Sequence, residues 1–184
     1  MGRIVLIGGG VRSGKSAFAL ARARRASPPR WYVATAEALD EEMRERARRH
    51  RAEREGELET VEEPLDLAAA LERTRGASVV VIDCLTLWLA NRLMRGEAAE
   101  ETLARLEEVL ERIAADQAEV LIVTNEVGMG VVPESVLGRA FRDLAGAAHQ
   151  RVARVADEIH VAILGVVLRV HPGPVEVSAR GREA

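Results

Sequence analysis

The feature that most constrains the fold is the segment G-G-V-R-S-G-K-S at residues 9–16. An apolar stretch over residues 4–8 precedes it, and helical periodicity over residues 16–26 follows it, so the segment joins a buried strand to a helix. Its glycines permit the dihedral angles that turn backbone N–H groups inward, and the helix N-terminus adds a positive dipole end. The pattern G-x-x-x-x-G-K-[ST] therefore predicts a phosphate-binding loop, or P-loop, for a nucleoside triphosphate.

Within this loop the side chains have separable expected roles. Lys15 is expected to be catalytic and to reach the β and γ phosphates, and Ser16 is expected to bind Mg²⁺. Lys15 is also the only lysine among 26 lysine and arginine residues, which singles out its position. The expected nucleotide contacts in the loop are Gly9, Gly10, Val11, Arg12, Ser13, Gly14, Lys15 and Ser16.

Asp83 is the candidate for a second magnesium ligand. It follows the apolar run V-V-V-I, where an acidic residue at the end of a buried strand can lie close to the nucleotide and its metal. The alternative is that Asp83 caps a helix that starts at Leu85, which is a frequent use of aspartate. The two roles are compatible.

The order of elements predicts an α/β fold with a mostly parallel sheet and helices on both faces. At 184 residues, we expect one domain over residues 1–171 and an irregular tail over residues 172–184, which carries two prolines and two glycines. Strands are expected at 4–8, 31–35, 79–83, 119–124, 158–164 and 166–170, and helices at 16–26, 65–74, 85–95, 98–116 and 136–156.

Composition and charge limit the classes of partner and the cellular location that we expect for this chain. A net charge of −3 and a pI of about 5.9 argue against a nucleic-acid-binding protein. The longest apolar run, residues 161–168, is far too short to span a membrane. The single cysteine, Cys84, excludes an internal disulfide and favours a reducing, cytoplasmic location.

An arginine-rich segment offers a second candidate site. Residues 44–54 contain six arginines, two glutamates and His50. A solvated helix with (i, i+4) ion pairs such as Glu42–Arg46 is one interpretation. An anion-binding surface is the other, because the arginines outnumber the available acids.

Several motifs together resemble one family. They are the P-loop, Y-V-A-T-A-E-A-L-D-E-E-M at 32–43, V-T-N-E-V-G-M-G-V-V-P-E at 123–134 and F-R-D-L-A-G at 141–146. From about Ile4 to Val170 the chain resembles the bifunctional adenosylcobinamide kinase / adenosylcobinamide-phosphate guanylyltransferases of cobalamin biosynthesis. The N-E-V-G-M-G block is far more specific than the P-loop, which many families share.

The resemblance implies a reaction sequence. The family phosphorylates adenosylcobinamide with ATP or GTP and then transfers GMP from GTP to adenosylcobinamide phosphate through a guanylylated histidine, a role that falls here on His50. It also implies a RecA-like fold and a homotrimer. The further nucleotide contacts that we expect on this basis are Ala34, Thr35, Ala36, Arg51, Ala52, Glu53, Arg54, Glu62 and Asp83.

Other histidines and carboxylates carry weaker expectations. His149 stands where the family commonly has asparagine, and His160 and His171 are expected to be structural or exposed. Glu126 is a candidate general base for the substrate hydroxyl, with a loop-bracing carboxylate as the alternative. Two other functions remain open from the sequence alone: a monofunctional P-loop kinase of a small molecule, and a RecA-like NTPase module.

Overall fold

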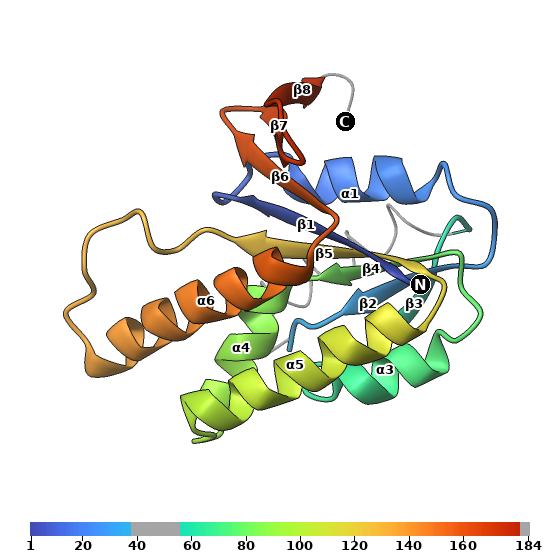
Figure 1. The fold of residues 1–184 in the computed structure, drawn as a ribbon. Helices are drawn as coiled ribbons and strands as arrows, with labels where there is room; N and C mark the ends of the chain where they lie inside the picture. The colour runs from blue at the N-terminus through green and yellow to red at the C-terminus, as the bar shows by residue number, and fades with distance from the viewer. Residues whose placement is uncertain (38–55, 181–184) are drawn as a thin grey trace.

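The computed structural model describes residues 1–37 and 56–180, and in this part of the chain eight strands form one sheet in the order β3-β2-β4-β5-β1-β6-β7-β8 (Figure 1). The strands are β1 (Arg3–Gly9), β2 (Arg30–Ala34), β3 (Glu59–Glu62), β4 (Val79–Asp83), β5 (Glu119–Asn125), β6 (Glu158–Ile163), β7 (Val166–His171) and β8 (Glu176–Arg180). The helices are α1 (Lys15–Ala23), α3 (Leu67–Arg73), α4 (Leu85–Met94), α5 (Ala99–Ala115) and α6 (Val136–Val155).

The first six strands in the sheet order run parallel. β1 pairs with β5 and β6, β4 pairs with β2 and β5, and β3 pairs with β2, whereas β7 and β8 add antiparallel at one edge. The prediction of a mostly parallel sheet is confirmed. Parallel strands present their carboxyl ends at one edge of the sheet, where open α/β folds bind ligands.

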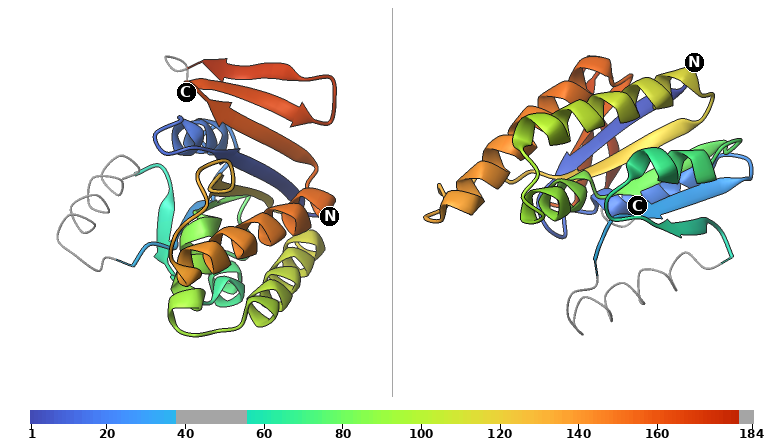
Figure 2. Two further views of the ribbon diagram at one scale, coloured as in Figure 1. Left: turned by 90° about the vertical axis from the view of Figure 1, so that its left-hand side faces the viewer. Right: turned by 90° about the horizontal axis from the view of Figure 1, so that it is seen from below.

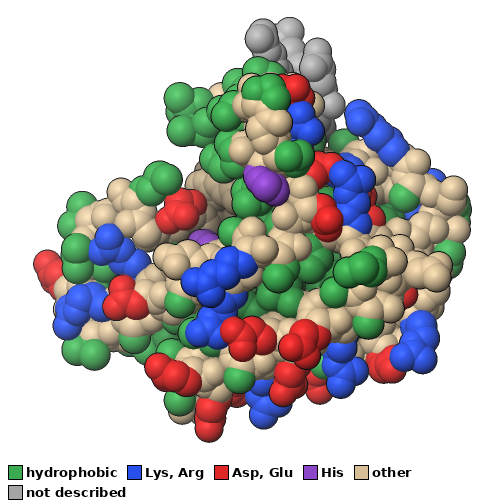
Figure 3. Space-filling model, in the orientation of Figure 1, with side chains coloured by type: hydrophobic (Ala, Val, Ile, Leu, Met, Phe, Trp, Pro, Cys, Tyr) green, Lys and Arg blue, Asp and Glu red, His purple; other side chains and the backbone are tan. Residues whose placement is uncertain are grey.

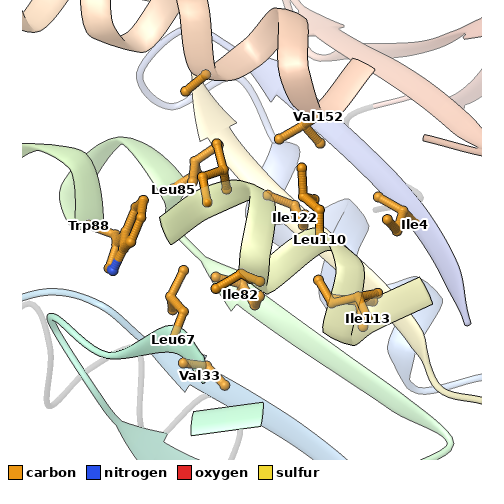
Figure 4. Close-up of a cluster of buried hydrophobic side chains, with 14 of the residues drawn as sticks. Ile4, Val33, Leu67, Ile82, Leu85, Trp88, Leu110, Ile113, Ile122 and Val152 are labelled. Atoms are coloured by element: carbon orange, nitrogen blue, oxygen red, sulfur yellow. The ribbon is translucent and has the colours of Figure 1, made fainter. Parts of the chain in front are cut away.

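Helices cover both faces of the sheet, as the sequence predicts. α1 lies on one face, and α3, α4, α5 and α6 lie on the other (Figure 2). Along β1 the side chains alternate, so Val5 and Ile7 pack in the cluster under α1 while Ile4 and Leu6 join the opposite cluster. In that larger cluster Trp88 is among the largest fully buried side chains (Figure 4).

Two strands depart from the sequence-based expectations. β3 was not expected, because E-T-V-E at 59–62 buries only Val61 and shows no run of apolar residues. The sequence predicts an irregular tail from residue 172, but residues 176–180 form β8, which pairs antiparallel with β7. The two prolines of the tail, Pro172 and Pro174, lie in the turn before β8, so they do not interrupt it.

The edge of the sheet at the amino ends of β1, β5 and β6 is tied to the end of α1 by ion pairs. Arg22 contacts Glu119 at 2.6 Å and Glu158 at 2.5 Å, and Arg3 also pairs with Glu158. The hydrogen bond from Arg22 lowers the pKa of Glu158 to about 2, against the opposing effect of burial.

His160 belongs to the same network and is structural, as expected. Its Nε2 lies 2.7 Å from Glu158 and its Nδ1 lies 3.0 Å from the Ser178 hydroxyl of β8. Burial lowers its pKa, so the ring is neutral near pH 7. His171 is exposed, which agrees with the other expectation. In the described residues no helix is both long and apolar enough to cross a membrane.

Candidate functional site

The P-loop connects β1 to α1 at the carboxyl edge of the sheet. Gly9 ends β1, and Gly14 precedes α1 with a φ of 95°, a left-handed conformation that favours glycine. A Cβ atom on Gly9 would lie 2.5 Å from the Ala162 carbonyl oxygen and 2.7 Å from Ser13 Oγ. Both glycines of the motif are therefore required by the backbone path, independently of any ligand.

Polar groups converge inside this loop. The Lys15 side chain is buried, and its Nζ donates a hydrogen bond to the Gly10 carbonyl at 3.0 Å. The Ser13 hydroxyl is buried and has no hydrogen-bond partner among the described residues. The N-terminus of α1 has no side-chain cap and no acidic residue in its first turn. A buried cation, an unpaired hydroxyl and an uncapped helix N-terminus form a site that suits a phosphate.

Asp83 ends β4, two strands away from the P-loop strand. β5 lies between β1 and β4, and Asp83 is paired in register with Val123 of β5 and Ala34 of β2. The N-cap of α4 is Cys84, and no side chain caps that helix. Asp83 therefore does not cap α4, which removes the alternative role, and its half-buried carboxylate lies at the carboxyl edge.

Ser16 and Asp83 provide oxygen ligands of the kind that Mg²⁺ prefers. Ser16 is in the first turn of α1, and α1 packs against β4. No group of three or more His, Cys, Asp or Glu side chains that could hold a metal occurs in the described ranges. Mg²⁺ is usually held by one or two protein ligands together with phosphate oxygens and water, and the assignment of Ser16 and Asp83 as its ligands stays a prediction.

A buried polar network lies behind this edge, and sequence reasoning missed most of it. Thr35 Oγ1 accepts a hydrogen bond from Cys84 N and donates one to Cys84 O, both at 2.8 Å. Asn125 Nδ2 donates to Thr86 Oγ1 at 3.1 Å, and Asn91 Nδ2 donates to the Thr35 carbonyl at 2.8 Å. The sequence did carry one indication of this network, because Thr35 and Asn125 are polar residues at the ends of strands.

This network fixes the ends of β2, β4 and β5 relative to one another. Burial, followed by the charge of Asp83, raises the pKa of the Cys84 thiol. The thiol is therefore protonated near neutral pH and serves as a packing group.

The remaining nucleotide contacts expected near β2 and β3 fall at the same edge. The Thr35 N–H donates to the Asp83 carbonyl at 3.2 Å, and the Ala34 carbonyl accepts from Glu63 N at 2.9 Å. The backbone of Ala34 and Thr35 thus already bonds within the protein, whereas Ala36 is exposed. Glu62 ends β3 with an exposed side chain, one strand beyond β2.

The loop after β5 borders the P-loop directly. Glu126 N donates to the Gly9 carbonyl at 3.0 Å, and the Glu126 carboxylate accepts from Gly128 N at 2.5 Å. Arg142 of α6 donates to the Gly128 carbonyl at 2.9 Å. Glu126 therefore makes the loop-bracing contact of the alternative interpretation beside the P-loop, and its role as a general base stays a prediction.

The structure thus brings the P-loop, Asp83, Ala36, Glu62 and Glu126 to one edge of the sheet. The arginine-rich segment lies outside the described residues, so the expectations for His50, Arg51, Ala52, Glu53 and Arg54 stay predictions.

Comparison with known proteins identifies the family of the chain. A family model described as "Cobinamide kinase / cobinamide phosphate guanyltransferase" matches residues 5–170. The bifunctional adenosylcobalamin biosynthesis protein CobP of Pseudomonas aeruginosa is 38% identical over 170 residues, which cover 92% of this chain and 98% of that protein. The bifunctional adenosylcobalamin biosynthesis protein CobU of Salmonella typhimurium is 36% identical, covering 91% of this chain and 99% of that protein.

A solved structure supports the fold alone. The KaiC-like protein PH0186 of Pyrococcus horikoshii superposes with a TM-score of 0.52 and 16% identity, covering 99% of this chain and 82% of that chain.

Proposed function

The chain belongs to the cobinamide kinase / cobinamide phosphate guanyltransferase family, and on that premise we propose that it catalyses two successive reactions in cobalamin biosynthesis. It phosphorylates adenosylcobinamide with ATP or GTP. It then transfers GMP from GTP to adenosylcobinamide phosphate, giving adenosylcobinamide-GDP and pyrophosphate. The observation that carries this proposal is the P-loop of a RecA-like fold, in which Lys15 is buried and donates to the Gly10 carbonyl, and the buried Ser13 hydroxyl has no partner among the described residues.

In the kinase step the P-loop stabilises charge on the γ-phosphoryl group. The substrate hydroxyl oxygen forms a bond to the γ-phosphorus while the bond to the bridging β,γ-oxygen breaks. Lys15 and the N–H groups at the start of α1 are already held in place, so they stabilise the developing charge without reorganising. Ser16 and Asp83 would hold Mg²⁺, which when bound neutralises charge on the β and γ oxygens.

In the guanylyl step His50 acts as the nucleophile. Its imidazole nitrogen bonds to the α-phosphorus of GTP as pyrophosphate leaves, and an oxygen of adenosylcobinamide phosphate then displaces the imidazole. A nitrogen with a pKa near neutrality suits both roles. Arg51 and Arg54 would neutralise the triphosphate, while Ala34, Thr35, Ala36, Ala52, Glu53 and Glu62 would contact the nucleotide.

We propose that the chain assembles as a homotrimer. The number of subunits is what the family resemblance implies, and association is supported by large apolar side chains exposed on the loop after β5 and the start of α6: Met129, Val131, Val132, Val136 and Leu137. This part of the molecule projects from the sheet (Figure 1), and its surface shows apolar side chains beside basic and acidic ones (Figure 3). Apolar surface of this kind marks association sites, and light scattering after size-exclusion chromatography measures the mass of the assembly directly.

The cytoplasmic location expected from the sequence stays a prediction.

A direct experiment tests the two activities. The protein is incubated with adenosylcobinamide, ATP and GTP in Mg²⁺, and corrinoid products are followed by mass spectrometry. We expect adenosylcobinamide phosphate to appear first and adenosylcobinamide-GDP to follow. A monofunctional kinase would stop at the phosphate even with excess GTP, and a RecA-like NTPase module would hydrolyse nucleotide without modifying the corrinoid.

A further inference from the structure

Three polar side chains from different elements meet beside the P-loop. Thr124 belongs to β5, His149 to α6 and Glu126 to the loop that follows β5. His149 Nε2 lies 2.7 Å from Thr124 Oγ1, and His149 Nδ1 lies 3.8 Å from Glu126 Oε2. The ring therefore lies between a buried hydroxyl, which it contacts, and a partly exposed carboxylate, which it faces.

The cluster is attached to the phosphate site through the backbone. Thr124 is paired in register with Gly8, and Asn125 with Gly9, the first residue of the P-loop motif. The next residue, Glu126, donates its N–H to the Gly9 carbonyl at 3.0 Å. The Glu126 carboxylate is thus anchored one residue beyond the strand that adjoins the P-loop strand.

The partners of the ring fix its tautomer. A neutral imidazole has one donor and one acceptor nitrogen, whereas an ionised carboxylate only accepts. We therefore expect the nitrogen facing Glu126, Nδ1, to carry the proton, and Nε2 to accept a hydrogen bond from the Thr124 hydroxyl. Burial lowers the pKa of His149, against the opposing charge of Glu126, so the neutral ring is the form present near pH 7. Among the described charged groups, Glu126 is the one whose charge acts on this ring.

Both carboxylate oxygens of Glu126 then face a donor. Oε1 accepts from Gly128 N at 2.5 Å, and Oε2 faces the Nδ1–H of His149. The distance of 3.8 Å is longer than a hydrogen bond, and catalytic hydrogen bonds commonly shorten only when substrate is bound. The carboxylate is directed by the loop on one side and by α6 on the other.

We propose that His149 is a positioning residue that orients the Glu126 carboxylate to accept the proton of the substrate hydroxyl during phosphoryl transfer. As the hydroxyl oxygen bonds to the γ-phosphorus, its O–H bond breaks, the proton goes to Glu126, and the nucleoside diphosphate leaves. This inference rests on the kinase half of the proposed function. It assigns no part in the guanylyl step to His149 or Glu126.

Histidine NMR tests the geometry without any activity. In ¹⁵N-histidine-labelled protein we expect His149 to be protonated at Nδ1 and unprotonated at Nε2 at pH 7.5. Glu126→Gln removes the charge that raises the pKa of this ring, so the pKa of His149 should fall in that variant. A proton on Nε2, together with a pKa that does not respond to Glu126→Gln, would overturn the proposal whether or not the protein is a kinase.

Two substitutions of His149 separate positioning from packing. The amide nitrogen of asparagine reaches roughly the place of Nδ1, whereas that of glutamine reaches roughly the place of Nε2. His149→Asn should therefore keep a donor toward Glu126 and lose the Thr124 contact, and His149→Gln should do the reverse. We expect His149→Gln to lose about tenfold or more in kinase kcat, which is a part of the ~10²–10⁴ that general-base catalysis contributes in total. His149→Gln should also keep more thermal stability than His149→Asn. His149→Asn should keep more of the kinase kcat than His149→Gln.

Controls make the outcomes distinct. His171→Asn, at an exposed histidine, should leave both measurements unchanged. Enzyme labelling by α-labelled GTP should be the same in every variant, so a loss of labelling throughout would point to the proposed function rather than to His149. If kinase kcat and stability fall together, with asparagine the worse substitution, His149 is a packing residue and the proposal is wrong.

Discussion

Lys15 Nζ lies 3.0 Å from the carbonyl oxygen of Gly10, so the ammonium group is folded over the same loop that is proposed to bind the triphosphate. The residue is only 7% exposed although its side chain is charged. Keeping a cation at a buried position carries a desolvation cost, which a phosphate would offset. The geometry therefore links the one lysine of the chain to the proposed chemistry.

Replacing this lysine should abolish most of the kinase activity. We expect Lys15→Ala to lose at least about two orders of magnitude in kinase kcat, the scale of losing one preorganised electrostatic donor. The measurement is phosphorylation of adenosylcobinamide at saturating nucleotide. Lys15→Arg is the matched control that keeps the charge but changes its shape, and it should lose less. An alanine variant with most of the wild-type kcat would remove Lys15 from the mechanism.

Asp83→Asn should change the magnesium dependence more than the stability. The substitution keeps the shape and removes the charge, and Asp83 does not cap α4. We therefore expect a higher Mg²⁺ concentration for half-maximal kinase activity and a melting temperature close to that of the wild type. Titration of activity with Mg²⁺ and a thermal melt measure the two effects. Unchanged Mg²⁺ dependence would leave Asp83 without a role in metal binding.

Two glycines of the loop after β5 provide a matched pair of substitutions. A Cβ atom on Gly128 would lie 2.8 Å from Glu126 Oε1, whereas one on Gly130 would meet nothing within 4 Å. Neither glycine has a positive φ, so alanine introduces no left-handed strain. The end of the Glu126 side chain is flexible, so it will move rather than the backbone.

We therefore expect Gly128→Ala to reduce kinase kcat by displacing the Glu126 carboxylate, with a reduction smaller than that of Glu126→Gln. Gly130→Ala should match the wild type in both rate and melting temperature. Equal rates for the two alanine variants would show that the position of the carboxylate does not matter for phosphorylation.

The stability of the protein should decrease in acid in two stages. Burial holds the pKa of His160 below its ordinary value of 6.5, so the unfolded chain takes up this proton first as the pH falls below 6.5. The ion pair with Arg22 holds the pKa of Glu158 at about 2 instead of 4.5, so its stabilisation is complete above pH 4.5 and is lost as the pH falls toward 2.

Urea denaturation at intervals from pH 7.5 to pH 3 measures this dependence. His160→Gln should flatten the decrease between pH 6.5 and pH 5, and Glu158→Gln should flatten it below pH 4.5. Both substitutions are expected to lower the free energy of unfolding at pH 7, because each removes one side of the Glu158–His160 contact at 2.7 Å. A wild-type stability that stays constant down to pH 4 would contradict the assignment.

Strong local signals explain why most of the fold was predictable. β4 was predicted with its observed bounds, since V-V-V-I-D is an uninterrupted apolar run ending in a charge. β3 and β8 were missed because each depends on a neighbouring strand: E-T-V-E has one buried side chain, and β8 is fixed by its pairing with β7. Hydrophobic periodicity indicates which residues of a strand are buried, and the two edge strands β3 and β8 bury few residues.

The candidate site was predictable where a motif marks it and not where tertiary contacts create it. The P-loop pattern correctly predicts that Lys15 and Ser16 stand where the loop meets the first helix, because the glycine spacing dictates the backbone path. The contact between His149 and Thr124 could not be predicted, because it joins α6 to β5 across 25 residues of sequence. Histidine and threonine are common residue types, and only the packing of the folded chain decides whether they contact each other.

The guanylyl step makes the sharpest prediction, and it falls on His50. Support comes from the surplus of arginines around this residue and from the family to which the chain belongs. A phosphoramidate at histidine is hydrolysed in acid and survives base, whereas a phosphoester of serine or threonine is generally stable in acid. We therefore expect α-labelled GTP to give a base-stable, acid-labile adduct on the denatured protein. GTP labelled at the γ-phosphorus should leave no label there, because pyrophosphate departs.

His50→Ala should abolish both this adduct and the transfer of GMP to adenosylcobinamide phosphate. The kinase step should be affected less, because Lys15 and the backbone N–H groups of the P-loop need no imidazole nucleophile. His149→Asn is the matched histidine control and should leave labelling intact, since His149 bonds to Thr124 and faces Glu126. If His50→Ala still labels and His149→Asn does not, the nucleophile belongs to α6, and the guanylyl step must be reassigned to the cluster beside β5.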